Sequence, residues 1–129
     1  MKKTKKGFTL VELLVVIAIL AVLTTVAIVG YVSFVNKADK SATQSEAYQI
    51  DTLIEASLTT ADALQIKDGL WITKTANGYV ATTTEPSDPI DISTDLSDFA
   101  SNLTNSNGAL IYTSRGYVVN VDTGETNKQ

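Results

Sequence analysis

The chain has 129 residues, a net charge of −4, 44% hydrophobic residues, no cysteine and no histidine. This length suits one domain rather than two. The missing residue types exclude disulfides, thiol catalysis, zinc fingers and histidine-based acid–base chemistry, so packing alone must hold the fold.

Positive charge is concentrated at the N-terminus, where Lys2, Lys3, Lys5 and Lys6 precede a long apolar segment. Because four of the 10 basic residues lie there, removal of residues 1–7 leaves six basic and 14 acidic residues, a net charge of −8. An acidic body repels the phosphates of nucleic acids, so we expect no direct nucleic-acid binding.

Residues 13–36 form an apolar segment of 24 residues without a charge. As a helix it reaches about 36 Å, enough to cross a hydrocarbon core of about 30 Å. Lysine-rich flanks stay in the cytoplasm, so the pattern predicts export of the C-terminus. A cleaved secretory signal is one alternative, but the segment is longer than a typical signal core and no small-x-small site follows it cleanly. A simple membrane anchor is another alternative.

Glu12 lies among apolar neighbours, four residues after Phe8. An ionised carboxylate in such surroundings is costly in a membrane. One interpretation is that Glu12 lies near the interface and reaches water. The other is that a cation meets it in an assembled state. A simple anchor accounts for the apolar length and the lysines but leaves Glu12 unexplained.

The segment KGFTLVELLVV at residues 6–16 resembles the prepilin-type cleavage and methylation signal of type IV pilins and their relatives. The family pattern is a short basic leader that ends in glycine, then phenylalanine, then glutamate four residues later at the head of an apolar helix. The resemblance covers residues 1 to about 40. It implies cleavage between Gly7 and Phe8 by a prepilin peptidase, N-methylation of Phe8, and pairing of Glu12 with the Phe8 amine of a neighbouring subunit.

The same resemblance implies a structural subunit of a type IV pilus-like surface filament rather than an enzyme. Its expected partners are other copies of the chain in a helical homopolymer, the peptidase, a pilus assembly ATPase and its platform protein. Before assembly the subunit would cross the cytoplasmic (inner) membrane once, with its C-terminus outside; afterwards it would lie in an extracellular filament. The alternative is a pseudopilin of a type II secretion or competence DNA-uptake apparatus, and a second class is a membrane-tethered enzyme or binding domain.

The helical pattern continues beyond the apolar segment. Apolar residues recur at three- and four-residue spacing from Ile50 to Leu64, and no proline interrupts residues 8–66. Lys67-Asp68-Gly69 is interpreted as a helix end closed by glycine. The sequence therefore predicts one helix over residues 8–66, apolar all round at first and amphipathic later.

The rest of the chain is predicted to be mostly strand. Residues 70–75 and 79–84 flank an Ala-Asn-Gly turn, and residues 109–114 and 117–121 flank Arg115-Gly116, so we expect two hairpins. The second hairpin places one set of side chains toward the helix: Leu110, Tyr112, Tyr117, Val119 and Val121.

Between the hairpins we expect a loop over residues 85–92 and a turn over residues 105–108. Residues 94–103 are predicted to form a short helix with Ser93 as its cap. The apolar side chains expected to point inward from it are Leu96, Phe99 and Leu103.

The predicted fold class is α+β, a long N-terminal helix packed on a small antiparallel β-sheet head. Three parts are expected: a cleaved basic leader at residues 1–7, the transmembrane and assembly half of the helix at residues 8–36, and a globular head at residues 37–129.

Other chemistry finds little support in the sequence. Four loop carboxylates and a second acidic stretch at residues 122–125 are candidate calcium ligands. Their spacing is not that of a calcium-binding hand, so we interpret them as solvated. We expect neither a metal nor a cofactor. The aromatic residues on the strands are interpreted as packing rather than a ligand platform. The loop carboxylates are Asp88, Asp91, Asp95 and Asp98, and the aromatic residues are Trp71, Tyr79, Tyr112 and Tyr117.

Overall fold

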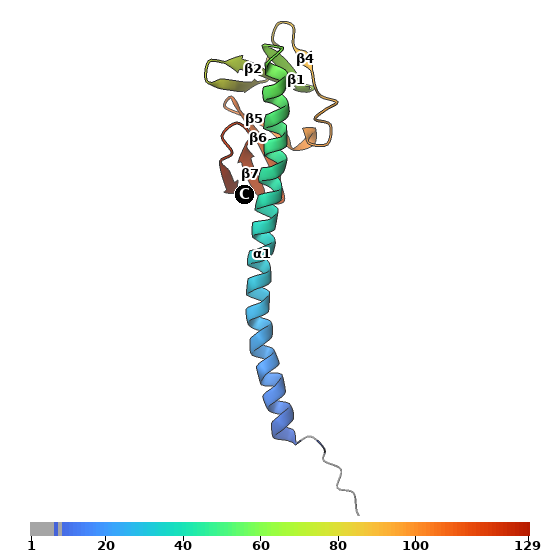
Figure 1. The fold of residues 1–129 in the computed structure, drawn as a ribbon, viewed down its shortest axis with the longest axis vertical. Helices are drawn as coiled ribbons and strands as arrows, with labels where there is room; N and C mark the ends of the chain where they lie inside the picture. The colour runs from blue at the N-terminus through green and yellow to red at the C-terminus, as the bar shows by residue number, and fades with distance from the viewer. Residues whose placement is uncertain (1–6, 8) are drawn as a thin grey trace, which may run out of the picture. The chain divides into compact units, whose positions relative to one another are not determined.

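The computed structural model describes residue 7 and residues 9–129. The chain forms two compact units, Met1–Lys37 and Ala38–Gln129, and we call the second the head unit. Helix α1 (Leu10–Leu58) is continuous through residues of both (Figure 1). The predicted α+β class is confirmed, since this helix is followed by small, mostly antiparallel sheets.

In the first unit α1 exposes apolar side chains on every side. The large hydrophobic residues from Leu10 to Phe34 are between 48% and 79% exposed in the isolated chain. A helix that is apolar all round is stable only in lipid or among other helices. Length and composition also make α1 suitable for crossing a membrane.

Polar groups within this apolar stretch find partners inside the helix. The hydroxyls of Thr24 and Thr25 donate to the backbone carbonyls of Leu20 and Ala21, at 2.6 and 2.8 Å. Satisfied hydroxyls of this kind can enter a hydrocarbon core at low cost.

Helix α1 ends at Leu58, so the predicted end at residue 66 is wrong. The hydroxyls of Thr59 and Thr60 donate to the carbonyls of Ala56 and Ser57, at 2.6 and 3.1 Å. The backbone N–H groups of the two threonines donate to the same carbonyls. The last free carbonyls of the helix are thereby satisfied and the chain turns away.

The segment after the helix is strand β1 (Ala63–Lys67), not a last helical turn. Leu64 and Ile66 are fully buried, whereas Gln65 and Lys67 are half-buried. Asp68-Gly69 is the turn of a hairpin, with Gly69 at φ +78°. Aspartate before glycine is a strong hairpin signal, and it outweighs the apparent helical spacing.

The head unit contains two four-stranded sheets, where one small sheet was predicted. The first has the order β3-β2-β1-β4, antiparallel except for the parallel β1–β4 pair. The second has the order β5-β6-β7-β8 and is antiparallel throughout. The other strands are β2 (Leu70–Thr75), β3 (Gly78–Thr82), β4 (Ile90–Asp91), β5 (Leu103–Ser106), β6 (Ala109–Ser114), β7 (Tyr117–Asn120) and β8 (Thr126–Lys128). The sheets meet where the Ala81 N–H donates to the Gly108 carbonyl at 2.8 Å.

Both predicted hairpins are confirmed. Strands β2 and β3 pair with Thr75 opposite Gly78, and β6 and β7 pair with Ser114 opposite Tyr117. Arg115 and Gly116 form the second turn with φ of +52° and +78°, the left-handed conformations that a two-residue hairpin turn requires. All five side chains predicted on the inner face of this hairpin are buried.

The predicted helix over residues 94–103 is wrong. Residues 93–99 form successive turns, and only a short 3₁₀ helix, η1 (Ala100–Asn102), follows before β5 begins. The Asp91 carboxylate accepts a hydrogen bond from the Ser93 N–H at 2.8 Å, so the turn begins on Asp91 and Ser93 is not a helix cap. The inward direction was right: Leu96 and Leu103 are fully buried and Phe99 packs against the core.

Three short strands besides β1 were not predicted. The loop expected over residues 85–92 contains β4, and β8 follows the acidic stretch at residues 122–125. The turn expected over residues 105–108 is only Asn107-Gly108, with φ of +50° and +89°, because residues 103–106 are strand β5.

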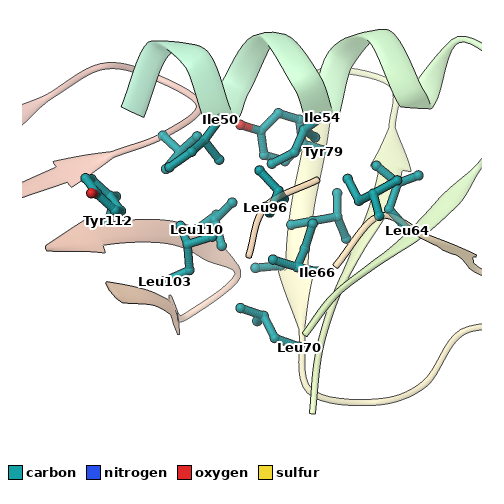
Figure 2. Close-up of a cluster of buried hydrophobic side chains, with 14 of the residues drawn as sticks. Ile50, Ile54, Leu64, Ile66, Leu70, Tyr79, Leu96, Leu103, Leu110 and Tyr112 are labelled. Atoms are coloured by element: carbon teal, nitrogen blue, oxygen red, sulfur yellow. The ribbon is translucent and has the colours of Figure 1, made fainter. Parts of the chain in front are cut away.

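One hydrophobic core joins α1 to both sheets. Figure 2 shows Ile50 and Ile54 pointing from the helix toward Leu64, Ile66 and Leu110 on the strands. Helix side chains that face the core recur at three- and four-residue spacing: Thr43, Ala47, Ile50, Ile54 and Leu58. The head unit therefore includes the second half of α1 as one wall of its core.

Candidate functional site

The residues predicted to act in processing and assembly lie at the start of α1. Gly7 and Glu12 are described by the structure, whereas Phe8 and the leader lysines lie outside the described residues. Roles for Gly7, Phe8 and Glu12 therefore stay predictions that the geometry can support through the described residues.

Gly7 is exposed and belongs to neither helix nor strand. A Cβ placed on it would meet no atom within 4 Å, and its backbone is not in the left-handed region. Nothing in the described residues therefore requires glycine at this position. A requirement imposed from outside, such as close access of a protease to an extended backbone, accounts for it better.

Glu12 forms a reciprocal pair of hydrogen bonds with Thr9, which sequence reasoning missed. The Thr9 N–H donates to Glu12 Oε2 at 3.3 Å, and the Glu12 N–H donates to Thr9 Oγ1 at 3.2 Å. Because α1 begins at Leu10, Thr9 is the N-cap and Glu12 the third helical residue. This is a capping box, and its signal was present in the sequence Thr9-Leu10-Val11-Glu12.

The capping box leaves part of the carboxylate available. Only Oε2 of Glu12 accepts a hydrogen bond from the described residues, and the side chain is exposed. The carboxylate also favours the positive end of the helix dipole. Glu12 is therefore held in one orientation with an oxygen free for a further donor.

A second polar cluster holds the head unit together. Arg115 binds both carboxylate oxygens of Glu46, with Nη2 2.9 Å from Oε1 and Nη1 2.9 Å from Oε2. The Tyr112 hydroxyl donates to Oε2 at 2.7 Å. This bidentate pair fastens the β6–β7 turn to α1. The hydrogen bond from Arg115 lowers the pKa of Glu46 below its ordinary value of 4.5.

We expect Glu46→Gln to destabilise the head unit at neutral pH but not in acid. The folded-state pKa of Glu46 is lowered, so its contribution is present above the ordinary value of 4.5 and is lost as pH falls through the folded value. The pair is partly exposed, so the expected loss at pH 7 is about 1 kcal/mol. Urea unfolding at pH 7 and pH 3 measures it, with the exposed loop variant Glu85→Gln as control. An equal loss at both pH values would contradict the electrostatic account.

The described part of the chain offers no other obvious chemical centre. It contains no group of three or more histidine, cysteine, aspartate or glutamate residues placed to hold a metal ion. Of the strand aromatic residues, Tyr79, Tyr112 and Tyr117 are buried, and Tyr112 packs edge-on against Phe99 with ring centres 5.9 Å apart. The aromatic residues are packing groups rather than an open platform.

Comparison with known proteins identifies the N-terminal segment. Residues 2–28 match the family described as the prokaryotic N-terminal methylation motif. The matched span contains Gly7, Phe8 and Glu12 and the first part of α1. No curated protein and no solved structure shows significant similarity to the chain.

The chain therefore carries the type IV pilin and prepilin signature at its N-terminus. This signature, together with the apolar helix, supports a pilin-like or pseudopilin protein that is anchored in a membrane before assembly. It favours a structural subunit over an enzyme.

Proposed function

We propose that the chain is a structural subunit of a type IV pilus-like surface filament. One observation carries the proposal: the match to a methylation motif over residues 2–28 includes the start of α1, whose apolar side chains are exposed, and the same chain continues into a folded head. A filament core of identical helices covers such side chains as well as a bilayer does.

We propose that the subunit passes through two stages, one in the membrane and one in the filament. In the first, residues 8–36 cross the cytoplasmic membrane, the leader at residues 1–7 stays inside, and the head at residues 37–129 lies outside. In the second, a prepilin peptidase has removed the leader and methylated Phe8, and an assembly ATPase with its platform protein moves the subunit into the filament. Cutting before the apolar segment keeps the helix, which a secretory cleavage would remove.

Electron microscopy of cells with and without the gene tests the proposal. Long surface filaments that disappear with the gene and return on complementation support a pilin. Unchanged surface filaments together with lost secretion or DNA uptake would instead indicate a pseudopilin, which shares the N-terminal signature. If loss of the gene changes neither the surface filaments nor secretion or DNA uptake, both the pilin and the pseudopilin forms of the proposal are contradicted.

We expect the mature chain to begin at Phe8 and to lack the seven leader residues. Gly7→Ala is expected to be tolerated because it adds one methyl group, whereas the bulky Gly7→Val should block cleavage by hindering access to the backbone. Mass spectrometry of the N-terminal peptide measures both the cut and the added methyl group. The matched control is Gly30→Val, since Gly30 lies in open space on α1 away from the cut. A mature chain that begins after Gly30, or an uncut Met1, would contradict this processing.

A further inference from the structure

One edge of α1 in the head unit, beside the side chains that face the core, has opposite charges at its two ends. Lys40 and Glu55 are exposed and Asp51 is half-buried. At about 100° per residue, the three side chains fall within about 60° of one another around the helix. Asp39 and Glu46 lie on the other side, where Glu46 is neutralised by Arg115. The stripe is therefore basic at its N-terminal end and acidic at its C-terminal end.

The acidic end lies along a groove between α1 and the β2–β3 hairpin. The groove has a volume of about 680 Å³, and its lining includes Tyr48, Asp51, Glu55 and Tyr79. The Tyr79 hydroxyl donates to Asp51 Oδ1 at 2.6 Å, which fixes the carboxylate at the edge of the core. A space of this size accommodates a long side chain from another molecule.

Negative charge in this groove is poorly compensated. Burial raises the pKa of the Asp51 carboxyl, the Tyr79 hydrogen bond opposes that rise, and the Asp122 charge adds to it. Lys74 also lines the groove and offsets part of this charge, but its Nζ is directed to the Leu58 carbonyl at 3.4 Å and forms no ion pair with Asp51 or Glu55. Within the described residues, the Arg115–Glu46 contact is the only ion pair, so Asp51 and Glu55 have no cationic partner there.

We propose that this groove receives Lys40 from a second copy of the chain that lies parallel and is shifted along the helix axis. Between parallel copies the charges are complementary only with a shift, because Lys40 lies 11 residues before Asp51 and 15 before Glu55. At about 1.5 Å per residue the required shift is about 16–22 Å. The inference rests on the proposed filament function and specifies one contact within it.

When each copy makes this contact with the next, the copies form an open chain rather than a closed ring. Each copy offers Lys40 to one neighbour and its groove to another, so the interface is heterologous and generates an open polymer. Lys40 and Glu55 are exposed and Asp51 is half-buried before assembly, so the pairs set register and partner choice more than affinity. Exposed Tyr48 lies between the charges along α1, where a neighbouring helix would cover it.

Zero-length carbodiimide cross-linking of sheared wild-type filaments tests the contact. The expected product joins the Lys40 amine to the Asp51 or Glu55 carboxyl and is identified by mass spectrometry of the cross-linked peptides. Within one helix Lys40 and Glu55 are about 22 Å apart, too far for direct coupling, so this product reports two chains. Detergent-solubilised, unassembled subunit is the control and should lack it. Filaments without the product would overturn the contact.

Charge reversal provides the second arm. Lys40→Glu or Glu55→Lys is expected to lower filament yield about fivefold, and the double variant should return it to within about twofold of wild type. Glu85→Lys, an exposed carboxylate away from the stripe, is the matched control and should change little. Failure of the double variant to recover would overturn the pairing. Cells whose wild-type chain forms no filament would overturn the proposed function as well, whereas normal filaments from all variants would overturn the contact alone.

Discussion

Glu12→Ala is expected to prevent filament assembly without preventing membrane insertion or cleavage after Gly7. The substitution removes a carboxylate that is costly in an apolar environment, so the unassembled subunit enters the membrane at least as well. If Glu12 pairs with the Phe8 amine of a neighbour in a core of apolar helices, as the resemblance implies, the same change leaves that amine without a partner. An unpaired buried charge costs several kcal/mol, so filament yield should fall more than about tenfold.

A pair between Glu12 and the Phe8 amine of a neighbour, as the resemblance implies, would also define the axial position of each subunit. A slide by one helical turn would leave both the carboxylate and the amine alone, so the alternative registers are disfavoured. Oε1 of Glu12, which accepts no hydrogen bond from the described residues, is where the amine would bind, since Oε2 already accepts the Thr9 N–H. The measurement is filament in sheared surface fractions, relative to processed subunit in membranes.

The capping box calls for two further variants, because Glu12→Ala removes a helix cap as well as a charge. Glu12→Gln keeps a side chain that can complete the capping box but carries no charge. Thr9→Val removes the hydroxyl of the cap and keeps the carboxylate, at a cost of about 1 kcal/mol in helix stability. If pairing is the main role, Glu12→Gln fails like Glu12→Ala and Thr9→Val assembles. If the cap is the main role, the outcomes of these two variants are reversed.

The hairpin turns were the part of the fold that could be predicted best from the sequence. Arg115-Gly116 predicted a two-residue turn, and the alternation of apolar residues on either side predicted which side chains are buried. The apolar helix could also be predicted, since no other structure satisfies the backbone of so long an apolar segment in lipid. These features depend on residues close together in the sequence.

The errors arose where two patterns fit the same residues. Ala61 and Leu64 are three apart, as in a helix, but Leu64 and Ile66 alternate with polar residues, as in a strand. The deciding signal was Asp68-Gly69, which acts as a hairpin turn. For residues 93–99 the apolar spacing also suggested a helix, but the Asp91 carboxylate accepts the Ser93 N–H and the segment forms turns.

Part of the candidate site could not be predicted from local sequence. The capping box was readable from four consecutive residues, whereas Glu46 and Arg115 are 69 residues apart. Only the fold brings them together. The groove beside Asp51 likewise depends on where the β2–β3 hairpin lies against α1.

Ile54→Ala is expected to cause the largest loss of stability in the head unit. Ile54 is fully buried in the core that joins α1 to both sheets. Removing three carbon atoms there loses hydrophobic transfer energy and leaves a cavity, for a total of about 3 kcal/mol. A domain of this size has roughly 5–10 kcal/mol in all, so the variant should lose about a third to more than half of its stability and unfold at a clearly lower urea concentration.

A soluble fragment that begins at Lys37 is the suitable material, since residues 38–129 form a compact unit and the exposed apolar part of α1 is left out. Its circular dichroism should show both helix and strand, and urea unfolding gives the free energy. Leu53→Ala is the matched control, because Leu53 precedes Ile54 on the same helix but is 38% exposed. Equal losses from the two variants would mean that α1 does not form a wall of the core. A large loss from Ile54→Ala alone would show that α1 forms one wall of the core of the head unit.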